Sequence, residues 1–185
     1  MRITIVLLLI LASCSSNDKK EANTDSFIDI HQFFTDQVEH MTNSDVAVFK
    51  RTRMDIITNS DSFVSPDWSQ ELFAFLELDI KQAVWKTDFK RVHTHDDPNE
   101  TSLVYETTNP NQKVKSFKIK EEDGKIQRFS AEIIEKGKIS SSVTALSYTK
   151  NVGYTMSVER NTKIMGNESY QIIGQFYKNS NQNKK

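Results

Sequence analysis

The segment RVHTHDDPNE, residues 91–100, contains the densest group of potential metal ligands in the chain. In an extended strand, His93 and His95 would point to the same side, and Asp96 or Asp97 could complete a site for zinc or another divalent ion. The same composition is typical of a polar turn before a strand at 102–108. Only three such ligands cluster here and no distant partner is marked, so we predict no metal site. These four residues stay as the candidates for a metal-dependent enzyme.

No other pattern predicts catalysis. The chain lacks a Gly-x-Ser-x-Gly turn, and its few glycines are scattered singly rather than grouped in a phosphate-binding loop. His31 and His40 fall on the outer face of an expected helix. The acidic run Glu121-Glu122-Asp123 precedes Gly124 and is typical of a solvated turn. We therefore expect neither enzymatic activity nor a cofactor.

The charge balance narrows the class of partner. The 185 residues carry 24 Lys and Arg against 25 Asp and Glu, which gives a formal net charge of -1. Because the two signs are interspersed and form no basic stripe, a nucleic-acid partner is not expected. The length predicts a single domain that can bury a core without a metal or disulfide.

The N-terminus has the layout of an export signal. Arg2 precedes an uninterrupted apolar stretch from Ile3 to Leu11, and small residues follow. The stretch is roughly ten residues long, whereas about 20 are needed to cross a bilayer as a helix. The sequence Leu11-Ala12-Ser13-Cys14 then resembles the lipobox of bacterial lipoproteins. That resemblance implies cleavage by signal peptidase II before Cys14 and attachment of diacylglycerol to its thiol.

A lipidated Cys14 would anchor the protein in a membrane, because two or more acyl chains hold firmly where one is marginal. Cys14 is the only cysteine, so no intramolecular disulfide can form. The composition, rich in Lys, Asn, Ser and Ile, is similar to that of Bacteroidota-type envelope lipoproteins. Ser15 after the lipidated cysteine favours the outer over the inner membrane, facing the periplasm or the cell surface.

The chain is expected to divide into four parts. Residues 1–13 are the signal peptide, and residues 14–24, SSNDKKEANT after the cysteine, form a lipidated flexible tether. A single α+β domain spans 25–177, and a disordered polar tail follows at 178–185.

Three amphipathic helices are expected in the N-terminal part of the domain. The first can be capped by Thr24, Asp25 or Ser26 and places Phe27, Ile30, Phe34, Val38 and Met41 on one face. The second follows Asn43-Ser44-Asp45, with Val46, Phe49, Ile56 and Ile57 turned inward. The third begins at Ser65-Pro66-Asp67 and buries Trp68, Leu72, Phe75, Leu76 and Ile80.

After Trp85 the apolar residues recur with a period of two. Segments rich in β-branched and aromatic residues alternate with short Gly- and Asn-containing connections, which is typical of an antiparallel meander. Six strands fit, or seven with residues 85–93. Phe117, Phe129 and Tyr154 belong to the dry face, and Lys118 and Arg128 to the wet face. The predicted fold is thus α+β, with two or three N-terminal helices packed on one face of a curved antiparallel meander of about six or seven strands.

Two functions from different classes follow. The first is a membrane-anchored, non-catalytic interaction or structural module that presents its polar sheet face or an edge strand to another envelope protein. The second is a carrier of a small apolar ligand, such as an acyl chain, held between helices and sheet. A filled interior would favour the module, whereas a pocket lined by Phe34, Leu72, Phe129 and Met156 would favour the carrier.

Overall fold

A computed structural model describes residues 29–54, 57–78, 80, 87–97 and 100–179. Three helices and nine strands follow one another along this part of the chain. They are α1 (Ile30–Thr42), β1 (Val46–Met54), β2 (Ile57–Val64), α2 (Trp68–Glu71), α3 (Phe73–Leu76), β3 (Phe89–Asp97), β4 (Glu100–Thr107), β5 (Val114–Glu122), β6 (Lys125–Lys136), β7 (Ser140–Thr149), β8 (Gly153–Thr162) and β9 (Gly166–Lys178).

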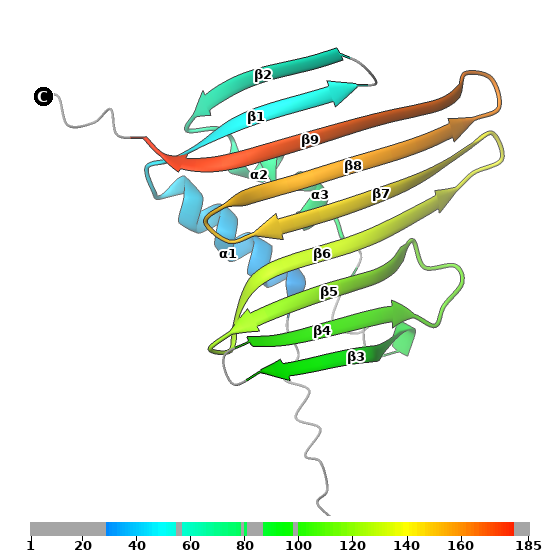
Figure 1. Cartoon of the computed structure of the whole chain (residues 1–185), viewed down its shortest axis with the longest axis horizontal. Coiled ribbons are helices and arrows are strands. Elements are labelled where there is room, and N and C mark those ends of the chain that lie inside the picture. Colours follow the sequence, from blue (N-terminus) through cyan, green and yellow to red (C-terminus); the bar gives the residue numbers. More distant parts are fainter. Residues whose placement is uncertain (1–28, 55–56, 79, 81–86, 98–99, 180–185) are drawn as a thin grey trace, which may run out of the picture.

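All nine strands belong to one antiparallel sheet in the order β2-β1-β9-β8-β7-β6-β5-β4-β3 (Figure 1). From β3 to β9 each strand pairs with the next one in the chain. The β1–β2 hairpin joins the far side of β9, where Val46 lies opposite Lys178 and Met54 opposite Tyr170. Lys178, where the polar tail was expected to begin, is therefore the last residue of the final strand.

The predicted fold class is wrong. The structure is mainly a nine-stranded sheet with one helix of 13 residues and two of four, not two or three helices packed on six or seven strands. The segment predicted as the second helix forms β1 and β2 instead, at residues 46–54 and 57–64, and Ile56 of that prediction lies outside the described residues. The β-branched and aromatic side chains of β1 and β2 favour a strand, and pairing with β9 supplies the backbone partners. This segment extends the sheet and does not cover it.

The helix α1 forms where the sequence predicts one, because its buried residues Ile30, Phe34, Gln37 and Met41 repeat at spacings of three and four. Asp29 is its N-cap and accepts a hydrogen bond of 2.9 Å from the backbone N–H of Gln32. The caps expected at residues 24–26 lie outside the described residues.

The predicted third helix is broken into two short turns. Asp67, not Ser65, is the N-cap of α2 and accepts hydrogen bonds from the backbone N–H groups of Ser69 and Gln70. The chain leaves helical geometry at Leu72, then again after α3, where Ile80 bonds back only two residues to the carbonyl of Leu78. Trp68, Leu72, Phe75 and Ile80 are nevertheless buried as expected, at 0–2% exposure.

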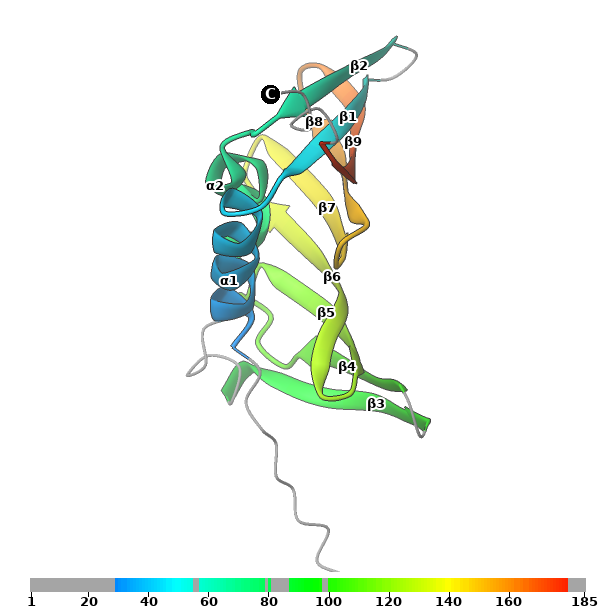
Figure 2. The same ribbon diagram turned by 90° about the vertical axis from the view of Figure 1, so that its left-hand side faces the viewer.

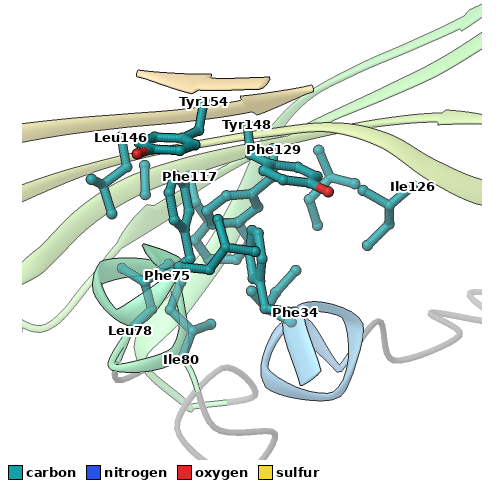
Figure 3. Close-up of a cluster of buried hydrophobic side chains, with 14 of the residues drawn as sticks. Phe34, Phe75, Leu78, Ile80, Phe117, Ile126, Phe129, Leu146, Tyr148 and Tyr154 are labelled. Carbon is teal, nitrogen blue, oxygen red and sulfur yellow. The ribbon is translucent and has the colours of Figure 1, made fainter. Parts of the chain in front are cut away.

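The sheet is curved, and all three helices lie against its concave face (Figures 1 and 2). Aromatic rings fill the space between the two layers (Figure 3). The Phe34 ring on α1 lies 4.9 Å from Phe75 on α3, 5.4 Å from Phe129 on β6 and 5.2 Å from Tyr148 on β7, measured between centroids. The contacts of Phe34 with Phe129 and Tyr148 are edge-on, and such pairs add to the free energy of burial and fix how the rings fit together.

The helices leave one end of the sheet uncovered in the described part of the chain (Figure 1). We call this the open end: β1, β4, β6 and β8 finish there, and β2, β5, β7 and β9 begin there. The other end, with the β7–β8 turn, is called the covered end. Along β8 the concave-facing residues change from Tyr154 and Val158, which are buried, to Arg160, which is exposed.

Candidate functional site

The predicted metal candidates lie on β3, an edge strand. His93 is opposite Val104 and His95 opposite Ser102, so the two imidazoles share a face, and both residues are exposed. Asp96 and Asp97 are the last two residues of the same strand. Within the described ranges, no three His, Cys, Asp or Glu side chains gather closely enough to hold a metal ion.

The carboxylate of Glu100, which begins the next strand, is paired with a lysine instead. Its pKa is lowered, first by the hydrogen bond from Lys120 and then by the charges of Lys120, Arg128 and His95. The nearest described carboxylate on β4 therefore belongs to an ion pair. The two other histidines are separate from this region. His31 on α1 has its Nδ1 3.2 Å from the carbonyl of Leu76, where it links two helices, and His40 lies in the last turn of α1.

The predicted lipid-attachment residue, Cys14, lies outside the described residues, as does the rest of the segment 1–28. Among the residues that the structure does describe, no helix has both the length and the apolar character needed to span a bilayer.

The pocket that the alternative carrier function requires between helices and sheet is filled by side chains. Phe34 and Leu72 have no exposed surface, and Phe129 retains 1%. Met156 is partly buried against the same cluster. Because interiors packed in this way leave few voids larger than a water molecule, an acyl chain could enter only by displacing these side chains.

A polar cluster lies at the edge of this core. The Glu71 carboxylate on α2 is 8% exposed, lies 2.5 Å from Lys50 Nζ on β1, and accepts a hydrogen bond from the hydroxyl of Tyr154 on β8. Burial, and then the hydrogen bond and charge of Glu71, raise the pKa of Tyr154 far above its ordinary value. Both carboxylate oxygens are engaged, so the cluster ties α2 to the sheet and offers no free base to a substrate.

A second tie of this kind holds α1. The hydroxyl of Tyr148 donates a hydrogen bond of 3.1 Å to Gln37 Oε1, and both residues are buried. Burial raises the pKa of Tyr148. A buried amide and hydroxyl that satisfy each other fix the position of the helix on the sheet.

A hollow of about 860 Å³ lies at the open end of the concave face. Its floor crosses three strands, where Glu135 on β6, Ser142 on β7 and Arg160 on β8 lie opposite one another. The hollow forms here for two reasons: the helices do not reach this half of the sheet, and β7 contributes only small serine side chains between the longer residues of its neighbours.

The lining of the hollow is predominantly basic. Lys113, Lys115, Lys136 and Arg160 face a single acid, Glu135. Lys113 Nζ lies 2.8 Å from Glu135 Oε1, and Lys115 Nζ donates to backbone carbonyls of the β4–β5 loop. The lining thus carries three more positive than negative charges, which favours an anionic group in the hollow.

Large apolar side chains surround this basic region on the turns. Ile139 in the β6–β7 turn is 67% exposed, and Ile164 and Met165 in the β8–β9 turn are 86% and 73% exposed. Met54 and Ile57, at the ends of β1 and β2, are 58% and 62% exposed. The sheet order makes these three connections neighbours along the open end.

Sequence reasoning missed this end of the sheet. Within the segment NTKIMGNE, residues 161–168, the residues Lys163, Ile164 and Met165 form the β8–β9 turn between the end of β8 and the start of β9. The signal was present in the pattern: apolar residues next to lysines, within a Gly- and Asn-containing turn, have no core to enter.

No family model matches the chain, and a search of curated proteins finds no significant match. The functional assignment therefore depends on the chemistry and geometry of the chain itself.

Proposed function

We propose that the protein is a lipid-anchored, non-catalytic module of a bacterial cell envelope that acts by binding another envelope component with its open end. The observation that carries this proposal is the hollow of about 860 Å³ on the uncovered half of the concave face. Lipid attachment at Cys14 is inferred from the lipobox-like sequence. It would confine the domain to a membrane surface, with the outer membrane favoured by Ser15.

The filled interior supports binding at the open end over carriage between the layers. Phe34, Leu72 and Phe129 occupy the space that an acyl chain would need. The lining of the hollow combines four basic side chains with the apolar side chains of Ile134, Ile139, Ile164 and Met165, so it suits an anionic surface that has an apolar layer beneath its charged groups.

The anchor is tested by metabolic labelling of the whole protein with radioactive palmitate, followed by fractionation of the envelope. We expect label in the outer-membrane fraction for the wild type and none for Cys14→Ser. Unlabelled wild-type protein recovered away from the membranes would refute the anchor.

The binding surface is tested by placing a photo-crosslinking amino acid at Ser142, in the hollow, or at Ser147, on the opposite face of the same strand. Irradiation of cells should give discrete adducts at position 142 and not at 147. Equal yields at both positions would contradict a binding surface at the hollow. Native mass spectrometry provides the companion measurement, since a stoichiometric acyl ligand on the purified protein would favour the carrier.

A further inference from the structure

We infer that the open end docks onto an anionic phospholipid surface, with the apolar turn residues Ile139, Ile164 and Met165 entering the interface. We call these three residues the turn tips. The inference rests on the proposed function, because it takes an envelope location as given, and it names the component that the open end meets.

The exposure of the turn tips has no explanation in the packing of the domain. Ile164 is 86% exposed, and Met165 and Ile139 are exposed by 73% and 67%. Each lies in a turn between two strands and outside the buried cluster of the core. Clustered exposed apolar residues mark a contact surface, and Met54 and Ile57 continue the row on the next hairpin.

Three lysines accompany the turn tips: Lys136 at the end of β6, Lys138 in the β6–β7 turn and Lys163 in the β8–β9 turn, here called the turn lysines. All three are exposed, and the turn sequences KGKIS and TKIMGN contain no acidic residue. Two acids flank these turn sequences along the chain: Glu135, which is paired with Lys113, and Glu168 on β9, which lies opposite Arg160. Apolar side chains bordered by lysines match the chemistry of an anionic bilayer surface, where the apolar parts insert and the ammonium groups meet phosphates.

The two turns are held in place before any docking. The backbone N–H of Lys163 donates a hydrogen bond of 3.1 Å to the carbonyl of Ile139, which joins the β8–β9 turn to the β6–β7 turn. Within the β8–β9 turn, Thr162 Oγ1 accepts a hydrogen bond of 3.0 Å from the N–H of Met165. A surface ordered in this way loses little conformational entropy when it binds.

The covered end offers a matched control. The β7–β8 turn there carries one exposed apolar residue, Val152, at 61% exposure. The full chain with Cys14→Ser has no other cysteine, so a single environment-sensitive fluorophore can be placed through Ile164→Cys or Val152→Cys. Both proteins keep the same N-terminal segment, and any attachment through that segment is common to both.

The labelled proteins are mixed with vesicles of phosphatidylethanolamine and phosphatidylglycerol, or of phosphatidylcholine alone. We expect a blue shift and several-fold brighter emission at position 164 with the anionic vesicles only, and no change at 152. Changing the three turn lysines to glutamine should weaken vesicle binding on the order of 100-fold, since each lysine near an anionic surface contributes about fivefold. As the control, the three covered-end lysines Lys125, Lys150 and Lys178 are changed to glutamine, and vesicle binding should stay nearly unchanged.

A probe at position 164 that stays in water on anionic vesicles would overturn the inference, as would equal responses at 164 and 152 or equal losses from the two lysine sets. The palmitate result separates this failure from failure of the proposed function. If the wild type takes up palmitate but the fluorophore at position 164 does not respond, the anchored module is supported and the docking surface is refuted. A probe that enters the bilayer, in a protein whose wild type takes up no palmitate, would support the docking surface and refute the lipid anchor.

Discussion

Gly174 on β9 provides the sharpest test of how the helices are tied to the sheet. A methyl group at this position would touch the Tyr154 ring, at 2.5 Å from Cζ and 2.9 Å from Cδ1, with Cε1 nearer still. Ordinary carbon contacts are about 3.5–4.0 Å. The substitution Gly174→Ala therefore forces the Tyr154 ring to move and pulls its hydroxyl away from Glu71.

The cost follows from these two effects. Overpacking of a well-packed core costs about 1–3 kcal/mol. A hydrogen bond to a charged acceptor contributes about 1.5–3 kcal/mol, and a displaced Tyr154 ring loses it. We therefore expect Gly174→Ala to lower the free energy of unfolding by about 2.5–6 kcal/mol. Gly174 has no positive φ, so alanine can adopt its backbone conformation, and the Tyr154 ring is the nearest obstacle.

A double-mutant cycle isolates that obstacle. Tyr154→Ala alone should cost about 3–5 kcal/mol, as for other large core residues. In the Tyr154→Ala background, Gly174→Ala should cost nothing, or stabilise by about 0.4–1 kcal/mol by restricting the unfolded chain. Tyr154→Phe is the control that keeps the ring and removes only the hydroxyl, and there Gly174→Ala should still cost about 1–3 kcal/mol.

Urea unfolding followed by far-ultraviolet circular dichroism measures all the variants, with the slope of each transition checked for a constant unfolded state. Equal costs of Gly174→Ala with and without the ring would refute the reasoning, because the strain would then lie in the backbone of β9.

Three further predictions use the same measurement or a simple binding assay. Phe34→Ala removes the central ring of the core and should lower the free energy of unfolding by about 3–5 kcal/mol. The raised pKa values of Tyr148 and Tyr154 keep both phenols protonated in the folded state, so stability is complete below pH 10 and falls above it. Above pH 10 each phenol lowers the free energy of unfolding by about 1.4 kcal/mol per pH unit. Tyr→Phe at either position should therefore make the free energy of unfolding, measured in urea, fall less steeply with pH. Changing His93 and His95 together to alanine should alter neither the bound metal measured by elemental analysis nor the melting temperature.

The C-terminal part of the sheet was predictable from local pattern. Alternation placed Phe117, Phe129 and Tyr154 on the dry face, and their exposures of 1%, 1% and 7% confirm it. Apart from the β8–β9 turn, the short turns between these strands were also visible as Gly- and Asn-containing segments. This part could be predicted because each strand pairs with its neighbour in the chain, so the information that sets the pairing is local.

The β1–β2 hairpin could not be predicted in the same way. Its first residue pairs with Lys178, at the other end of the chain, and no local pattern reports that contact. Val46 and Phe49, three residues apart, suggest one face of a helix, while their β-branched and aromatic character suggests a strand. The pairing with β9 decides between them. The hollow escaped prediction for the same reason, because it depends on which strand ends become neighbours.

The length of α1 explains why the protein has an open end. Its 13 residues span about 20 Å as a helix, whereas the 13 residues of β9 span about 43 Å as a strand. Even laid along the strands, α1 would cover less than half of β9, and α2 and α3 are each only four residues long. The concave face of β7 changes accordingly, from buried Tyr148 and Leu146 to the serines of the hollow. Large apolar side chains then return only beyond the floor, on the turns, where no element described in the structure can cover them. Core packing cannot account for that return, and contact with a surface outside the molecule can.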